Sequence, residues 1–167
     1  MRTRVHVNIK TRDLEQSIQF YSALFGCAPT KVREDYANFR LDEPGLHLAL
    51  VLDPAHQGGE SDEHFGVELF EQGELDGWRG RLEQADMPLR IEEAVTCCYA
   101  VANKFWVQDP DGNDWEFWVR SAEADAMHDK ATPAEQTGCC APVSAEKPRM
   151  PLSTIAKLGE SSGGGCC

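Results

Sequence analysis

The hydrophobic and polar positions of the chain follow one order of elements in its first third. Alternation of apolar and polar residues predicts a half-buried strand at 4–10. Hydrophobic residues at helical spacing then predict a helix that is capped by Asp13 and stopped by Gly26. The order closes with three short predicted strands, around 29–33, 37–41 and 46–52.

The same order starts again after a linker rich in proline and glycine at 53–61. A strand at 64–70, a helix at 75–85 and a strand at 89–94 are predicted, followed by an aromatic hairpin with strands at 104–108 and 114–119. One such copy cannot bury its sheet alone. We therefore predict an α+β fold in which two βαβββ modules, at about 3–53 and 62–120, form a cupped mixed sheet.

Residues 121–167 have a different character from the domain at 1–120. They are rich in Ala, Pro, Ser, Glu and Gly, show no hydrophobic periodicity and end in SSGGGCC. Such composition cannot bury enough apolar surface to order the chain. We predict a short helix at 122–130 and then a flexible, cysteine-containing tail.

Composition narrows the range of partners. The 167 residues carry a net charge of −12, which argues against nucleic acid or an anionic membrane as the main partner. No apolar run is long enough to cross a membrane, and the N-terminal residues lack the pattern of an export signal. The default expectation is a cytoplasmic protein.

Six of the seven cysteines stand in three adjacent pairs, and Cys27 is expected to be a packed thiol. Paired thiols in a reducing compartment favour a soft metal or metalloid as ligand, although burial or chance would also account for individual pairs. The tail pairs either pass such a ligand to the first pair or belong to a dispensable extension. The pairs are Cys97-Cys98, Cys139-Cys140 and Cys166-Cys167.

One carboxylate and two imidazoles are candidate metal ligands. Glu116 lies among aromatic residues, where a carboxylate is costly to bury unless it is paired or bound to a metal. His6 and His64 occupy the same position in the first strand of each module. If the modules pair about a pseudo-twofold axis, the three side chains converge. Two His and one carboxylate with open coordination positions suit non-haem Fe(II) and oxygen chemistry.

Each of these ligands has an ordinary structural alternative. A strand histidine is commonly a hydrogen-bonded residue, and Glu116 could be a solvated residue on a wet sheet face. The position of the first module that matches Glu116 is Ala49, so a fourth ligand is missing there, with His47 as a less favoured replacement nearby. His56 and His128 are expected to be solvated.

Several segments together resemble a known family. Within the vicinal oxygen chelate superfamily, which includes glyoxalase I, extradiol dioxygenases and bleomycin-resistance proteins, the chain resembles the organoarsenical C–As lyase family, with the cadmium-inducible proteins as near relatives. The resemblance covers about 3–120 and is carried by FY and LF at 20–25, YANF at 36–39, HFGV at 64–67, TCCYA at 96–100, KFWV at 104–107, DPDG at 109–112 and WE at 115–116.

The resemblance implies Fe(II)-dependent, oxygen-using cleavage of the carbon–arsenic bond, and hence arsenic resistance. The expected substrates are trivalent organoarsenicals such as methylarsonous acid and aromatic arsenicals, with inorganic arsenite as product. It also implies that His6, His64 and Glu116 bind the metal and that Cys97 and Cys98 bind the substrate. Trivalent arsenic is soft and binds thiolates, which agrees with that role.

Adjacent residues of a regular strand face opposite ways, so Cys97 and Cys98 must lie in a loop or bulge in order to chelate together. Two other functions remain open. One is a non-catalytic, thiol-based cadmium- or arsenic-binding protein; the other is a glyoxalase-like isomerase, or a dioxygenase of other substrates, with structural cysteines. The two modules either pair within one chain or swap between the chains of a homodimer.

Overall fold

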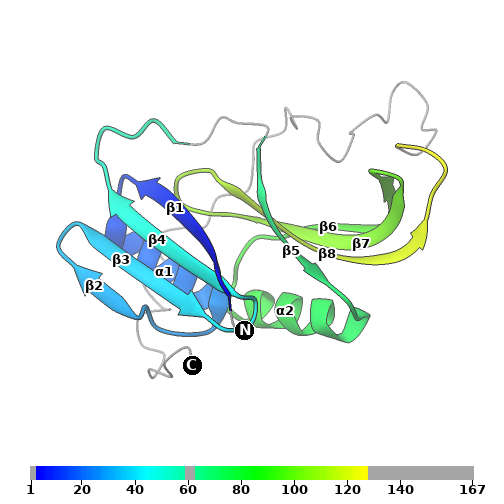
Figure 1. Cartoon of the computed structure of the whole chain (residues 1–167), viewed down its shortest axis with the longest axis horizontal. Helices are drawn as coiled ribbons and strands as arrows, with labels where there is room; N and C mark the ends of the chain where they lie inside the picture. The colour runs from blue at the N-terminus through cyan, green and yellow to red at the C-terminus, as the bar shows by residue number, and fades with distance from the viewer. Residues whose placement is uncertain (1–2, 59–62, 128–167) are drawn as a thin grey trace.

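The computed structural model describes residues 3–58 and 63–127, and it shows two modules side by side (Figure 1). No helix in these residues is long and apolar enough to cross a membrane. The first module consists of β1 Val5–Thr11, α1 Leu14–Phe25, β2 Lys31–Arg33, β3 Tyr36–Leu41 and β4 Leu46–Leu52. The second consists of β5 Phe65–Leu69, α2 Gln72–Gln84, β6 Arg90–Cys97, β7 Ala100–Gln108 and β8 Asp114–Glu123.

Each module forms a four-stranded mixed sheet with the same strand order. The orders are β1-β4-β3-β2 and β5-β8-β7-β6, and in both the first strand of the module runs parallel to the last while the other neighbours are antiparallel. The α+β class and the duplicated βαβββ module are therefore confirmed. Strand pairing stays inside each module among the described residues, which leaves β1 and β5 as sheet edges.

Local signals set the helix ends. Asp13 caps α1 by accepting a hydrogen bond from the backbone N–H of Gln16 at 3.1 Å, and Gly26 ends it in the left-handed region at φ 71°. α2 begins three residues earlier than the sequence predicted. Glu71 and Glu74 form a reciprocal capping box there, and the first turn of α2 is polar and exposed, so hydrophobic spacing did not reveal it.

The two faces of the second sheet differ sharply. Trp115, Phe117 and Val119 of β8 are almost fully buried in the core on the helix side. Side chains alternate along a strand, so Glu116 points to the opposite face, as the sequence predicted. The polar face of this sheet is consequently the one available for chemistry.

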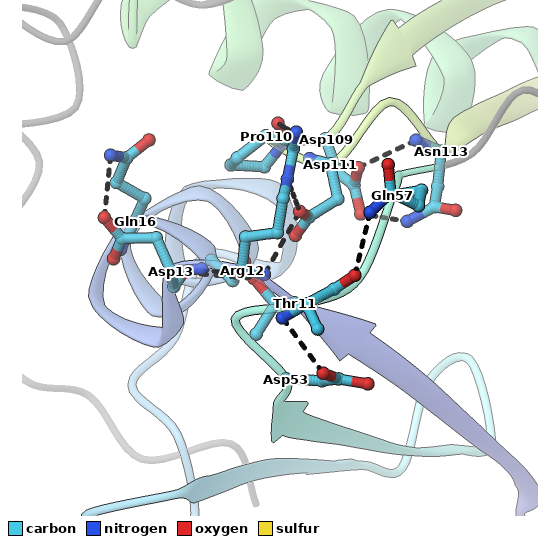
Figure 2. A network of polar contacts seen from close by, with 12 residues as sticks. Thr11, Arg12, Asp13, Gln16, Asp53, Gln57, Asp109, Pro110, Asp111 and Asn113 are labelled. Carbon is cyan, nitrogen blue, oxygen red and sulfur yellow. Dashed lines mark hydrogen bonds and ion pairs between the residues drawn. The ribbon is translucent and has the colours of Figure 1, made fainter.

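A buried polar network joins the modules. The Tyr21 hydroxyl of α1 donates a hydrogen bond to Asp109 Oδ2 at 2.7 Å. Arg12, just after β1, donates from Nε to Asp111 Oδ1 at 2.8 Å, and Figure 2 shows Arg12 reaching the β7–β8 turn beside Asp109 and Asn113. The turn of the second module is thereby held against the first.

The helix predicted at 122–130 is wrong for the part that the structure describes. β8 continues through Ala122 to Glu123, because these residues pair with Val101 and Ala100 of β7. Residues 124–127 follow without helical structure. β8 therefore crosses the boundary that we predicted at 120, and the predicted flexible tail from 128 on lies outside the described residues.

Candidate metal centre and thiol pair

Two of the three predicted metal ligands meet on the polar face of the second sheet. His64 immediately precedes β5, and its Nε2 lies 3.4 Å from Oε2 of Glu116. The Glu116 side chain is only 14% exposed. Two donor atoms bound to one transition-metal ion at a right angle lie about 3 Å apart, so this pair fits a shared ion with little movement.

A glycine leaves space beside the same carboxylate oxygen. Gly66 is the register partner of Glu116 across β5 and β8. A Cβ atom at Gly66 would lie 3.3 Å from the backbone oxygen of Glu116 and 3.8 Å from its Oε2. The missing side chain thus keeps open the space next to the oxygen that faces His64, which is where a bound ion would need room.

Lys104 of β7 contacts the other oxygen of Glu116, and the sequence did not lead us to it. Its Nζ lies 3.0 Å from Glu116 Oε1 and 3.5 Å from Glu92 Oε2, and its side chain is 3% exposed. A lysine at the centre of the aromatic strand, on the same face as Trp106, was the available signal. The predicted strand began at this residue, which hid its central place.

Trp106 forms a wall of the same site. Its ring is 5.0 Å from that of His64 in an edge arrangement, and the Arg90 guanidinium carbon lies 4.8 Å from its ring centroid. The indole Nε1 is buried and has no hydrogen-bond partner within the described part of the chain. Trp106 therefore packs against the ring of His64 and offers a buried donor that no described residue uses.

His6 lies in the other sheet, where it stacks on His47. The two residues are register partners in β1 and β4, and their ring centroids are 4.5 Å apart. Nε2 of His47 is 3.3 Å from the side-chain nitrogen of Asn38. Burial lowers the pKa of His47, and the charges of His6 and Arg40 lower it further. His47 accordingly belongs with His6 and not with the Glu116 site.

His6 does not join His64 and Glu116 within one chain. Across residues 3–58 and 63–127, no group of three or more His, Cys, Asp or Glu residues could hold a metal ion. In Figure 1, β1 (blue) begins at the lower edge of the view and β5 (blue-green) descends from the upper edge. The start of β1, which carries His6, and the start of β5, which directly follows His64, are thus well separated.

The thiol pair lies where β6 ends and a strained turn begins. Cys97 ends β6, and Cys98 and Tyr99 both have positive φ, at 53° and 64°, in the two-residue turn to β7. This places the sulfur atoms of Cys97 and Cys98 3.3 Å apart. The expectation that the two cysteines leave regular strand geometry is confirmed for Cys98, whereas Cys97 remains the last residue of β6 and pairs with Ala100.

The redox state of these cysteines differs between the two residues. Cys98 is free and exposed, whereas Cys97 is disulfide-bonded. Cys27 is disulfide-bonded as well, so the expectation of a packed thiol there is wrong. Chelation of one ligand by both sulfurs of the turn therefore requires the reduced form of Cys97. The cysteine pairs of the tail lie beyond the described residues.

The turn lies on the polar face but at a distance from Glu116. Cys97 pairs with Ala100, which shares its face of β7 with Lys104, and Glu116 pairs with Trp106. The strand rises about 3.3 Å per residue, so roughly 20 Å of β7 separates the thiol turn from the carboxylate. Thiols and carboxylate share a surface without being in contact.

Two βαβββ modules and a polar sheet face with a histidine–carboxylate pair together indicate one class of protein fold. The model of the Glyoxalase/Bleomycin resistance protein/Dioxygenase superfamily matches residues 3–117, and the chain belongs to that superfamily.

Three relatives show where the chain lies within this superfamily. An enzyme of Bacillus sp. (strain MD1) named trivalent organoarsenical cleaving enzyme is 38% identical over 145 residues, covering 82% of this chain and 89% of the relative. An enzyme of the same name from Thermomonospora curvata is 38% identical over 140 residues, covering 84% and 89%. The cadmium-induced protein CadI of Mycobacterium bovis is 34% identical over 143 residues, covering 83% and 93%.

Solved structures agree on the fold. A glyoxalase/bleomycin resistance protein/dioxygenase from Alicyclobacillus acidocaldarius has a TM-score of 0.57 at 20% identity, covering 70% of this chain and 90% of that one. A protein described in the same words from Nocardioides has a TM-score of 0.54 at 21% identity, covering 79% and 89%. At such identities the likeness concerns the fold alone.

Proposed function

We propose that the protein cleaves the carbon–arsenic bond of trivalent organoarsenicals, such as methylarsonous acid and aromatic arsenicals, in an Fe(II)- and oxygen-dependent reaction that releases arsenite. The observation that carries this proposal is the Cys97-Cys98 turn on the same sheet face as the His64–Glu116 pair. The names of relatives at 38% identity support it. In the cytoplasm, where we place the protein, both cysteines would be reduced.

The metal ligands in this proposal are His64, Glu116 and His6, with His6 supplied by a second copy of the chain. His6 is exposed on its own sheet, apart from the other two. β1 and β5 are both sheet edges, and Val5 on β1 is 67% exposed. A homodimer that places the β1 edge of one copy beside β5 of the other would unite the three ligands and cover this apolar residue.

Different residues of the chain have different roles in the proposed reaction. The reduced Cys97 and Cys98 thiols replace two hydroxyl groups on arsenic and release water, so the substrate is held by two bonds. The thiol turn must approach Glu116, because about 20 Å separates them along β7. Trp106 packs against the ring of His64, and Lys104 holds Glu116 in place. Ferrous iron, when bound there, would supply one electron for the activation of oxygen.

The direct test uses reduced protein that is loaded anaerobically with Fe(II) and then mixed with methylarsonous acid in air. We expect inorganic arsenite to form together with oxygen consumption. The same protein prepared without metal is the control, and it should bind the arsenical without releasing arsenite. Release of arsenite at an equal rate without any metal would refute the iron requirement.

Subunit mixing tests the shared site. His6→Ala and Glu116→Ala proteins should each be inactive. Unfolding and refolding them together gives heterodimers in which one site carries both changes and the other carries neither. Half of the dimers are then mixed and half of their sites are intact, so activity should return to about a quarter of the wild-type level. No recovery in a mixed, folded dimer would place all three ligands in one chain.

A thiol-based binding protein without catalysis is the second candidate. The cadmium-induced relatives at 34% identity favour it, as does the separation of His6 from the other ligands. It predicts stoichiometric, thiol-dependent binding of Cd²⁺ or arsenical by the reduced protein, with no oxygen consumption in the assay above. Catalytic turnover would exclude it.

A further inference from the structure

We propose that Lys104 is a positioning residue that occupies Oε1 of Glu116, so that this carboxylate offers a bound metal only the single oxygen Oε2. This inference rests on the proposed role of Glu116 as a metal ligand and adds to it how the ligand is presented. It concerns the number of coordination positions left open for oxygen and substrate.

The contacts of the two carboxylate oxygens are divided. Oε1 of Glu116 accepts a hydrogen bond from Lys104 Nζ at 3.0 Å, and Oε2 lies 3.4 Å from His64 Nε2. Gly66 leaves the space beside Oε2 empty, since even a Cβ atom there would lie 3.8 Å from this oxygen. One oxygen is therefore committed to the lysine, and the other faces the space that an ion would fill.

Lys104 is held firmly enough to act in this way. Its side chain is 3% exposed, so the ammonium group cannot exchange its partner for bulk water. Its second carboxylate, Glu92, lies at 3.5 Å and is itself paired with Arg90 at 3.2 Å. The ammonium also lies 5.2 Å from the Trp106 ring centroid. Arg90, Glu92, Lys104 and Glu116 together carry no net charge.

The cation has a predictable effect on metal binding. A positive charge that donates to a carboxylate withdraws negative charge from it and repels an incoming divalent ion. Lys104 thus weakens metal binding while it prevents a two-oxygen, chelating mode of Glu116. Because Oε1 of Glu116 does not bind the metal, one more coordination position stays open for a reactant. This open position offsets the lower affinity for the metal.

Binding of Co²⁺ to reduced, metal-free protein tests the inference without any need for turnover. In Lys104→Met, which keeps the length and burial of the side chain but not its charge, loss of the repulsion between the ammonium and the ion should let Co²⁺ bind at least about threefold more tightly. The visible absorption of the bound Co²⁺ should change, because Glu116 can then bind through both oxygens. If wild-type activity is established, turnover by this variant should fall at saturating substrate.

Two further variants separate positioning from folding and from charge. Lys10→Met removes another lysine–carboxylate pair, Lys10 Nζ to Asp53 Oδ2 at 2.9 Å, far from Glu116 in the other sheet, and should change neither the affinity nor the spectrum. Glu92→Gln alters a part-exposed residue and leaves Lys104 to Glu116 alone. It should weaken Co²⁺ binding and leave the spectrum unchanged.

The outcomes are distinct. Tighter binding with a changed spectrum in Lys104→Met supports the positioning role. Weaker or equal Co²⁺ binding by this variant with an unchanged spectrum overturns the positioning role. In that case, Co²⁺ binding by the wild-type protein still supports the metal site itself. If Lys104→Met fails to fold, tighter binding by Glu92→Gln overturns the inference in its place. Failure of the wild-type protein to bind Co²⁺ overturns the metal site and this inference together.

Discussion

The hydroxyl of Tyr21, on α1 of the first module, donates a hydrogen bond of 2.7 Å to Asp109, in the β7–β8 turn of the second module. Both residues are buried, and the same hydroxyl accepts a hydrogen bond from the Trp115 indole at 3.2 Å. Because Glu116 follows Trp115 in the chain, this network sets where the polar face of the second sheet lies relative to the first module.

Removal of this hydroxyl should destabilise the protein. In Tyr21→Phe, the Trp115 N–H is left buried without an acceptor and Asp109 loses one donor. An unsatisfied buried group costs about 1–3 kcal/mol, and we expect a loss of this size in the free energy of unfolding, measured with urea. Tyr99→Phe, which removes a hydroxyl from a residue that is 56% exposed, is the matched control. Equal stability of the two variants would contradict a role for the contact.

Stability should also depend on pH through Asp109. Burial raises the pKa of this carboxyl, and hydrogen bonds from Asn113 and Tyr21 oppose the rise only in part. A carboxyl with a raised pKa in the folded state binds a proton more readily there than in the unfolded chain. Its contribution to stability is therefore greatest at low pH and declines as pH rises from about 4, the unfolded value, through the higher folded pKa.

Urea titrations across this pH range, for wild type and for Asp109→Asn, measure the effect. The asparagine variant cannot ionise at this position, so the decline attributed to Asp109 should be absent from it. Asp53→Asn is the control, because hydrogen bonding to Lys10 lowers the pKa of that exposed carboxyl and gives a dependence of the opposite sign. An identical pH profile for wild type and Asp109→Asn would show that the buried carboxyl does not titrate in this range.

Sequence patterns predicted those structural features that depend only on neighbouring residues. The bounds of α1 followed from Asp13 and Gly26, because capping and the left-handed region depend only on neighbouring residues. The opposite orientation of Glu116 and Trp115 followed from strand alternation. The departure of Cys98 from strand geometry followed from the requirement that two adjacent side chains face one ligand.

Contacts between distant parts of the chain were not predictable in the same way. The repeat phase indicated that His6 and His64 are equivalent, and the structure shows equivalent strands. Equivalence does not bring two residues together, and here the modules pack through Tyr21 and Asp109 on the helix side. Lys104 was missed because its partner, Glu116, is defined by the register between β7 and β8, which no local pattern encodes.

Gly66 should be essential for metal binding but not for folding. In Gly66→Val, the new side chain would enter the space beside Glu116, whose backbone oxygen lies 3.3 Å from the added Cβ position. We expect Co²⁺ affinity to fall at least about tenfold, as is usual when the surroundings of a ligand are disturbed, with nearly unchanged secondary structure by circular dichroism.

Gly73→Ala, at a position of α2 where an added Cβ atom meets nothing within 4 Å, provides the control and should bind Co²⁺ as wild type does. Undiminished Co²⁺ binding by a folded Gly66→Val protein would show that the ion does not use the space next to Oε2 of Glu116.

The vicinal thiols should be required for the arsenical and not for the metal. In reduced Cys97→Ser or Cys98→Ser protein, a single thiolate remains, and loss of chelation should weaken binding of phenylarsine oxide at least about a hundredfold, since effective concentrations within a chelate are high. Co²⁺ affinity should not change, because the turn lies about 20 Å along β7 from Glu116. Isothermal titration with phenylarsine oxide and with Co²⁺ measures the two affinities.

Cys27→Ser, the control, removes a cysteine from the first module and should keep arsenical binding intact. Full arsenical affinity in both single variants of the turn would show that arsenic binds elsewhere, and equal loss of Co²⁺ binding would show that the cysteines serve the metal.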